Sequence, residues 1–256
     1  MALGGHVEVE PHADRVVIRC PDEPDYWDGN RVIFRGSAVR PDAQVAQFRA
    51  DFPAARHVRI GWDAPGLEKG EGHSDLEARG FEIDIADVLL CHGAPLAAPV
   101  PQGISLREIR SDADWAQVEA LQIETGLEEG QAIETYGPFV AGRCKVRRQQ
   151  SGAGHGAWFG AFDGDLLVGD LGLMLGEGIA RYQSVETRAS HRGKGICPAL
   201  LSMAAAWGLA RQPDLRFVII ADEGGMPARL YRSRGFAFAE TFLSALRPPG
   251  ALHAEP

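Results

Sequence analysis

The segment best suited to bind a ligand or catalyse a reaction spans residues 183–203, where an extended stretch runs into a glycine-rich loop and then into an Ala/Leu-rich helix. Gly193 and Gly195 let the backbone turn with its N–H groups exposed. A helix that begins there adds unpaired amides and the positive end of its dipole. Arg192 and Lys194 place fixed positive charge beside the turn. Together these features predict a loop that binds phosphate groups.

Two common phosphate loops fit this stretch poorly. A Walker-type loop needs Ser or Thr after Gly-Lys to reach magnesium, whereas Gly195 follows Lys194 here. A dinucleotide-binding fingerprint needs three glycines after the first strand of a βαβ unit, and this loop lies late in the chain with two. The spacing Arg192-x-x-Gly195-x-Cys197 instead resembles the pyrophosphate loop of the GCN5-related N-acetyltransferase (GNAT) superfamily, whose pattern is Gln/Arg-x-x-Gly-x-Gly/Ala. An ordinary glycine-rich turn between a strand and a helix is the alternative for this loop taken alone.

A second motif follows the loop in the order and separation that the superfamily shows. Residues 217–221 form a short apolar run typical of a buried strand. The segment 228–236 then resembles the family's closing helix, which ends in Leu-Tyr-x-x-x-Gly-Phe. Gly235 is expected to end that helix and Phe236 to open the last strands. Two motifs together are more specific than either one, and the resemblance covers residues 103–248.

The elements that must position these motifs are also predicted upstream. Residues 104–109 alternate as a first strand, and Ser111 begins a helix with a capping signal. A second helical stretch over 132–148 is expected to be broken or bent at Gly137-Pro138. Asp163-Gly164-Asp165 predicts a hairpin. The resulting order β-α-α-β-β-β-α-β-α-β matches the acyl-CoA N-acyltransferase fold, so the resemblance implies an α/β protein with a mixed central sheet flanked by helices.

About a hundred residues precede this region and also have a globular composition. Apolar segments predict four strands there, at 16–18, 31–34, 57–61 and 81–85. The segment 76–81 echoes 230–236, and an apolar strand precedes each copy, which indicates a weak internal repeat. A chance match of so few residues is the alternative.

We therefore expect two domains, 1–100 and 101–256, joined by a Pro/Ala-rich extended linker at 93–101. The first is a smaller α/β domain of related but degenerate design, as in tandem bacterial members of the superfamily. Because it contains nothing like the glycine loop, we expect it to pack against or wall the acceptor site rather than bind the cofactor.

Whole-chain properties exclude several other classes. The net charge is −9 with mixed signs, which argues against a nucleic-acid partner. No apolar run is long enough to span a bilayer, and residues 1–6 turn polar too soon for a secretory signal. The four scattered cysteines and eight histidines lack metal-ligand spacing, which predicts free thiols and no metal. We expect a cytoplasmic protein with no membrane partner, and the sequence also allows a homodimer.

The resemblance implies an acyltransferase that moves the acetyl group of acetyl-CoA to a primary amine by direct attack in a ternary complex. The backbone N–H of Val185 is the implied donor to the thioester oxygen. Tyr231 matches the position whose hydroxyl often protonates the departing thiolate; a phenol with a pKa of about 10 can do so for a thiolate of about 8.5. Glu186 faces away from Val185 and Thr187, and glutamates on this strand act as the base in some relatives. The alternatives are an aromatic core role for Tyr231 and surface solvation for Glu186.

The implied cofactor site consists of the strand end, the loop and the closing-helix tyrosine: Val185, Thr187, Arg192, Gly193, Lys194, Gly195, Ile196, Cys197 and Tyr231. Two residues depart from the family pattern. Cys197 stands where Gly or Ala is usual, although its backbone N–H can still donate. The stretch 224–227 lacks the usual Asn that contacts the cofactor, which lends weight to a competing function, a non-catalytic acyl-CoA-binding regulatory module.

The acceptor is the least determined part of this prediction. The first two helices normally shape the acceptor pocket in this superfamily, and here that region is rich in acidic residues and contains one tyrosine: Glu124, Glu128, Glu129, Glu134 and Tyr136. An acidic wall would favour a cationic amine, and a solvated helix face is the alternative. Small-molecule and peptide amines both stay open.

Overall fold

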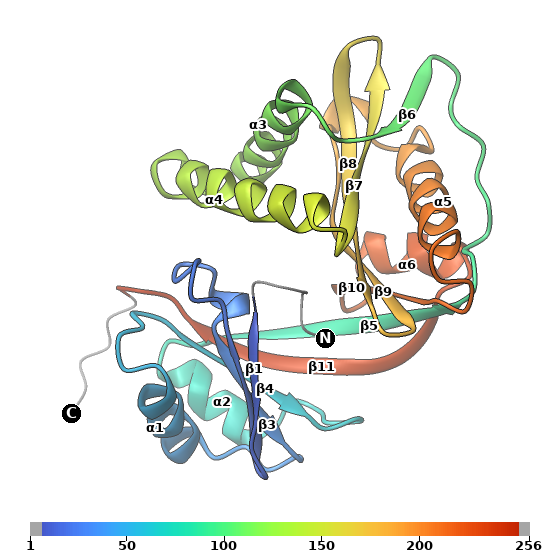
Figure 1. The fold of residues 1–256 in the computed structure, drawn as a ribbon. Helices are drawn as coiled ribbons and strands as arrows, with labels where there is room; N and C mark the ends of the chain where they lie inside the picture. The colour runs from blue at the N-terminus through green and yellow to red at the C-terminus, as the bar shows by residue number, and fades with distance from the viewer. Residues whose placement is uncertain (1–6, 251–256) are drawn as a thin grey trace.

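The computed structural model describes residues 7–250, in which all eleven strands form one mixed sheet with helices on both faces (Figure 1). The strand order is β1-β2-β3-β4-β11-β5-β10-β9-β8-β7-β6. The first six residues, on which the expectation about a secretory signal rests, lie outside the described range. Within that range, no helix has both the length and the apolar character needed to cross a bilayer.

The C-terminal half follows the predicted order of elements. These are β6 (Ile104–Glu108), α3 (Asp112–Glu128), α4 (Ile133–Gly152), β7 (Gly156–Asp163), β8 (Leu166–Gly176), β9 (Ile179–Thr187), the 3₁₀ turn η2 (Ala189–His191), α5 (Ile196–Leu209), β10 (Arg216–Asp222), α6 (Met226–Ser233) and β11 (Ala237–Arg247). The Ser111 hydroxyl caps α3 by accepting from the Asp114 N–H at 3.1 Å, as predicted. Gly164 and Asp165 form the predicted turn between β7 and β8.

The expected break at Gly137-Pro138 does not occur, because α4 runs through Pro138 as one helix. Proline lacks one backbone donor, which removes a single hydrogen bond near the start of this 20-residue helix. The following turns bury Val140 and Cys144 in the cluster that α3 and α4 form against the sheet. Packing of that face therefore outweighs the local cost of the proline.

The N-terminal half is a shorter version of the same arrangement. It contains β1 (Glu8–Pro11), β2 (Arg15–Arg19), the 3₁₀ turn η1 (Trp27–Gly29), β3 (Arg31–Arg35), α1 (Pro41–Asp51), β4 (Val58–Asp63), α2 (Glu71–Ala78) and β5 (Glu82–His92). Strands β1 to β4 pair in the same way as β7 to β10: the first two pairs are antiparallel and the third is parallel. Helices equivalent to α3 and α4 are absent from residues 7–92, so one face has no such cover.

The two halves exchange their final strands in the middle of the sheet. β5 pairs with β10, and β11 pairs with β4, each in antiparallel fashion, and β5 and β11 also pair with each other. Leu89 of β5 belongs to the core beneath α5 and α6, whereas Leu243 of β11 belongs to the N-terminal core around Phe48 and Trp62. Figure 1 shows β5 and β11 running side by side between the two halves. Each half thus completes the core of the other.

The internal repeat is also visible where α2 and α6 end. Gly80 and Gly235 have φ of 79° and 95°, the left-handed conformation that ends a helix. The next N–H groups donate back in the same way, from Phe81 to the Leu76 carbonyl at 3.1 Å and from Phe236 to the Tyr231 carbonyl at 3.2 Å. Leu76 therefore occupies the position that Tyr231 holds in the C-terminal half, and it has no hydroxyl.

Candidate functional site

The parallel strands β9 and β10 diverge in the C-terminal half. They pair only over Ile179–Arg181 and Arg216–Val218. β9 then continues to Thr187 and β10 to Asp222 without further pairing between them. In the N-terminal half, by contrast, β3 and β4 stay paired to their last residues, Arg35 with Asp63. Of the two parallel pairs, only β9 and β10 leave backbone groups unpaired toward each other at their carboxyl ends.

A bulge in β9 accompanies this divergence. Ser184 has a φ of 45°, and among residues 7–250 it is the non-glycine residue in the left-handed region. The register of β8 with β9 shifts between Asp170 and Gly172. The Arg147 guanidinium donates to the Ser184 hydroxyl at 2.7 Å. The contact joins α4 to β9 at the bulge.

The side chains after the bulge alternate between the two faces of the sheet. Val185 packs against the apolar cluster under α5 and α6. Glu186 faces the opposite helices, where its carboxylate accepts a hydrogen bond from the Thr125 hydroxyl of α3. A β-carbon added to Gly169 would lie 3.4 Å from the Thr187 hydroxyl and 3.0 Å from Ile196, so Thr187 lies on the α5 face. The alternation predicted for residues 185–187 is therefore present.

The glycine loop is open and positively charged. Gly193 and Gly195 have φ of 76° and 82°, and Gly195 is the N-cap of α5. A β-carbon at Gly193 would meet no atom within 4 Å, and one at Gly195 would meet only Pro101, at 3.8 Å. In the described part of the chain, the N–H groups of residues 193–195 donate to no protein acceptor. These exposed amides, beside the Lys194 ammonium, fit a pyrophosphate group.

The neighbours of the loop fix its position and tune its charge. Arg192 donates to the Thr187 carbonyl at 3.0 Å and pairs with Glu128 at 2.7 Å, so part of its charge is already balanced. Ile196 is buried and anchors the start of α5 in the core. Burial raises the pKa of the Cys197 thiol to about 12, which keeps it neutral. Cys197 is thus an apolar wall of the site rather than a nucleophile.

Tyr231 lies on α6 and is only 5% exposed. Its ring is tilted against Phe236 with the ring centroids 6.2 Å apart. Burial raises the pKa of its phenol above the usual value, with a smaller contribution from the nearby Cys197. Tyr231 is therefore an uncharged hydroxyl next to the first turn of α5, on the face that also holds Val185.

A buried carboxylate pair lies on the opposite face, and the sequence reasoning missed half of it. Asp170 of β8 is the cross-strand partner of Glu186. Its Oδ2 accepts from Trp158 Nε1 at 2.7 Å and from Gln122 Nε2 at 3.0 Å, whereas its buried Oδ1 has no partner within residues 7–250. Burial, and then the charge of Glu186, raises the pKa of Asp170 to about 8. Burial likewise raises the pKa of Glu186.

Arg147 supports this pair from α4. It donates to the Gln122 side-chain oxygen at 2.7 Å, and its guanidinium lies 4.8 Å from the centroid of the Trp158 ring. The signal that could have identified Asp170 is an acidic residue inside the otherwise apolar run 166–175. Over the described residues, no three or more His, Cys, Asp or Glu side chains gather as metal ligands would.

The acidic residues of the α3–α4 region do not form one wall. Glu124 pairs with Arg188 and Glu128 with Arg192, so both face the segment that follows β9. Glu134 and Tyr136 instead line a cavity of about 850 Å³ between the two halves. Its other walls are residues 22–28 of the N-terminal half, further residues of α4, and Pro248 with Pro249.

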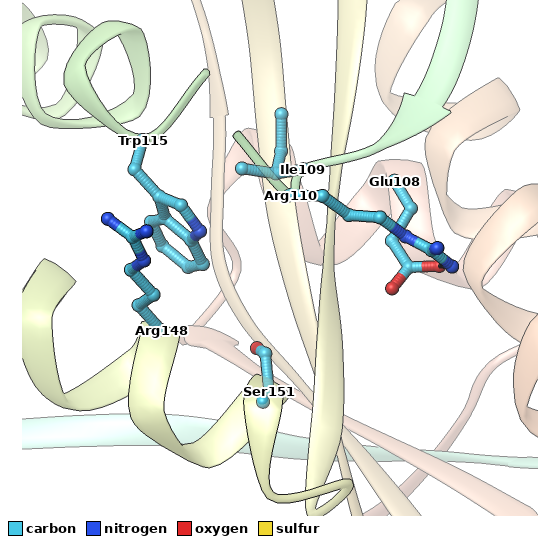
Figure 2. A pocket seen from close by; sticks show the side chains of 7 residues that line it. Glu108, Ile109, Arg110, Trp115, Arg148 and Ser151 are labelled. Atoms are coloured by element: carbon cyan, nitrogen blue, oxygen red, sulfur yellow. Dashed lines mark hydrogen bonds and ion pairs between the residues drawn. The ribbon is translucent and has the colours of Figure 1, made fainter. Parts of the chain in front are cut away.

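A second, smaller cavity lies apart from these features. It measures about 310 Å³ and is lined by the β6–α3 connection and the last turns of α4. Figure 2 shows Trp115 and Arg148 on one side of it and Glu108 with Arg110 on the other. None of its lining residues is among the cofactor, catalytic or acceptor-region residues predicted from the sequence, so we do not assign the chemistry to it.

Comparisons with known proteins place this geometry in a class. Neither the protein-family models nor the curated proteins compared with the sequence gave a match. A functionally unknown conserved protein from Staphylococcus epidermidis aligns with a TM-score of 0.71 at 10% identity, over 97% of this chain and 96% of that one. A GCN5-related N-acetyltransferase from Kribbella flavida gives 0.64 at 18% identity, over 96% and 91%. A tandem GNAT protein from the clavulanic acid biosynthesis pathway gives 0.57 at 15%, over 98% and 85%.

The sheet and the diverging strands therefore show the acyl-CoA N-acyltransferase fold, which this chain shares with these solved structures. The alignments cover nearly the whole chain, including the N-terminal half. Together with the repeated strand pairing, this coverage identifies the tandem form of the fold. In residues 7–92 of this chain, the counterparts of β6, α3 and α4 are absent. The fold and its mixed sheet agree with the expectation from the sequence.

Proposed function

We propose that the protein is an N-acetyltransferase that transfers the acetyl group of acetyl-CoA to a primary amine by direct attack in a ternary complex. The observation that carries this proposal is the divergence of β9 from β10, with the glycine loop and α6 following the carboxyl ends of the same two strands. Ligands of α/β proteins bind at the carboxyl ends of parallel strands. The equivalent pair in the N-terminal half stays closed and has no such loop, so one site per chain is expected.

Acetyl-CoA supplies the activated acetyl thioester, and this chain supplies the groups that hold it. The amides of residues 193–195 and the Lys194 ammonium bind the pyrophosphate, and Ile196 and Cys197 line the base of the loop. The Val185 N–H donates to the thioester oxygen, and Thr187 borders the arm of the cofactor. Charge that develops on that oxygen is stabilised best by a donor already fixed in a folded strand.

Glu186 acts as the base for the incoming amine. Its raised pKa lies nearer neutrality than that of a solvated glutamate, which suits proton transfer at physiological pH. The ammonium form of the acceptor first loses one proton to reach the nucleophilic state. A second N–H proton leaves as the C–N bond forms and the C–S bond breaks, and both pass to solvent through Glu186, directly or through water.

Tyr231 gives one proton to the leaving thiolate and is reprotonated from solvent, so the reaction releases one proton overall. Its raised pKa does not oppose this role, because burial raises the pKa of a thiol in the same place. The neighbouring Cys197 thiol, with a pKa of about 12, shows the size of that effect. The phenol and the departing thiol thus remain comparable acids.

A non-catalytic acyl-CoA-binding module is the second candidate. It is favoured by residues 223–225, a glycine-containing connection into α6 that offers no side-chain amide to the cofactor. An enzyme should transfer acetyl to some amine and lose rate in Tyr231→Phe. A binding module should bind acetyl-CoA without turnover, and Tyr231→Phe should not change its affinity for acetyl-CoA.

The first test is calorimetric titration of acetyl-CoA into the wild type and a Gly195→Glu variant. The substitution places bulk and negative charge in the loop and should abolish the binding heat. Gly154→Glu is the matched control, because Gly154 has nearly the same φ, 81°, and a β-carbon there would meet no atom within 4 Å. Gly154 lies beyond α4, away from the carboxyl ends of β9 and β10. Absence of binding by the wild type would overturn the proposal.

A further inference from the structure

The 850 Å³ cavity between the two halves has the size of a small-molecule site. Residues 22–28 of the N-terminal half form one wall, and the first turns of α4 form the facing wall. Residues 22–28 connect β2 to β3 in the N-terminal half, and α4 is a helix that only the C-terminal half has. The cavity is therefore a product of the tandem arrangement.

Aromatic rings make up the inner wall of this cavity. Tyr26 and Trp27 come from the N-terminal half, and Tyr136 and Phe139 come from α4. The Phe139 ring centroid lies 6.4 Å from that of Tyr26 and 5.8 Å from that of Tyr136. Such faces attract cations and flat or apolar groups.

Acidic residues outnumber basic residues among those that line the cavity. Five carboxylates line it, against one arginine, Arg56: they are Asp22, Glu23, Asp25, Asp28 and Glu134. Arginines pair with several of them, including Glu23 with Arg143, Asp28 with Arg59 at 2.8 Å, and Asp25 with Arg56 at 3.5 Å. The ion pair between Asp25 and Arg56 has a long N–O distance, and both of its side chains are exposed. Glu134 makes no ion pair in the described part of the chain. Negative charge therefore remains at the exposed rim.

The cavity also borders the proposed base. The Tyr136 ring packs against Gly126 so closely that a β-carbon there would lie 2.0 Å from it. The adjacent Thr125 donates to Glu186. Burial, and then the charge of the Glu186 carboxylate, raises the pKa of Tyr136. Tyr136 thus lines the cavity and also lies close to the residues that hold the proposed base.

We propose that this cavity holds the acceptor, and that the acceptor is a small molecule with at least two amino groups joined by an apolar or flat spacer. This inference rests on the proposed function. The reacting amine must be neutral when it attacks, so it gains little from the carboxylates. A second amine stays protonated throughout, and the acidic rim with its aromatic floor binds that charge while the first amine reaches Glu186.

The test compares 1,5-diaminopentane with 1-aminopentane as acceptors, which differ by one charged end. The diamine should have the higher kcat/KM, and its advantage should shrink at high salt because the rim is exposed. Glu134→Gln and Asp25→Asn should each raise KM for the diamine about two- to fivefold and leave the monoamine unchanged. Glu177→Gln, an exposed glutamate in the β8–β9 turn, is the control.

A cavity-filling variant tests the location separately. Gly142 lines the cavity on α4, and a β-carbon there would meet no atom within 4 Å, so Gly142→Leu fills space without a clash and favours the helix. It should abolish calorimetric binding of 1,5-diaminopentane while leaving acetyl-CoA affinity and thermal stability intact. Gly152→Leu, equally open on the same helix, is the control.

The outcomes separate this inference from the proposed function. Acetyl-CoA binding with equal rates for both amines, or a lysine peptide that exceeds the diamine, would overturn the cavity assignment and leave the acetyltransferase standing. Full diamine binding in Gly142→Leu would do the same. Failure to bind acetyl-CoA would overturn the function itself, whereas calorimetric binding of the diamine would still report on the cavity.

Discussion

Asp170→Asn should remove a pH-dependent loss of stability that the buried carboxylate pair imposes. Asp170 is fully buried, and its pKa rises from an ordinary 3.8 to about 8. Below about pH 4 the carboxyl is protonated in both the folded and the unfolded chain. As the pH rises, the unfolded chain releases its proton first, so the folded state loses stability until the pH passes the folded pKa near 8.

The magnitude follows from the width of that window. Each pH unit inside it lowers the free energy of unfolding by about 1.4 kcal/mol, so the wild type is less stable at pH 7 than at pH 4 by about 4 kcal/mol on this account. The group has no solvent exposure, so solvent screening does not reduce the figure. Asn keeps the shape, and its carbonyl oxygen can still accept from Trp158 and Gln122.

Urea unfolding at pH 5.5, 6.5 and 7.5 measures the effect. The stability of Asp170→Asn relative to wild type should grow by about 1.4 kcal/mol per pH unit, or about 3 kcal/mol across the series. Asp165→Asn, an exposed carboxylate in the β7–β8 turn, should show no such trend. Parallel pH profiles for Asp170→Asn and wild type would show that Asp170 ionises normally and would refute the reasoning.

Two further predictions concern the reaction and the fold. Tyr231→Phe removes the proposed acid and should lower kcat by about 10² to 10⁴, with acetyl-CoA affinity by calorimetry unchanged; an unaltered kcat would assign Tyr231 to the core alone. A fragment of residues 101–256 lacks β5 and leaves β10 unpaired on one side, so it should fail to show cooperative unfolding by circular dichroism. Co-expression with residues 1–100 should restore it, and independent folding of the fragment would contradict the exchanged-strand account.

Much of the C-terminal half could be predicted from local patterns. The cap at Ser111, the hairpin at Gly164 and the glycine that ends α6 each depend on short-range geometry, so neighbouring residues suffice to identify them. The four N-terminal strands expected from apolar runs correspond to β2, β3, β4 and β5 for the same reason, with His57 and Phe81 lying one residue before β4 and β5. The continuity of α4 through Pro138 was not predictable locally, because packing on α3 and the sheet decides it.

The candidate site divides along the same line. The glycine loop and the alternation of residues 185–187 each depend on residues that are adjacent in the sequence, and the structure shows both. The pairing of Asp170 with Glu186 joins positions on different strands, and the register shift in β8 and β9 brings them opposite each other. Their raised pKa values arise from burial, which no pattern in the sequence displays.

By itself, the sequence determined the order of elements, the glycine loop and the echo of one helix end in the other, because glycine conformation, capping and apolar periodicity act over a few residues. Only the tertiary structure decided that β5 and β11 cross between the halves, that β9 and β10 diverge, and that residues 22–28 face α4 across a cavity. Those features depend on which strands pair and what they bury together. The residues involved are distant in the sequence, by more than a hundred positions for β5 with β11 and for residues 22–28 with α4, so their contacts form only when the chain folds.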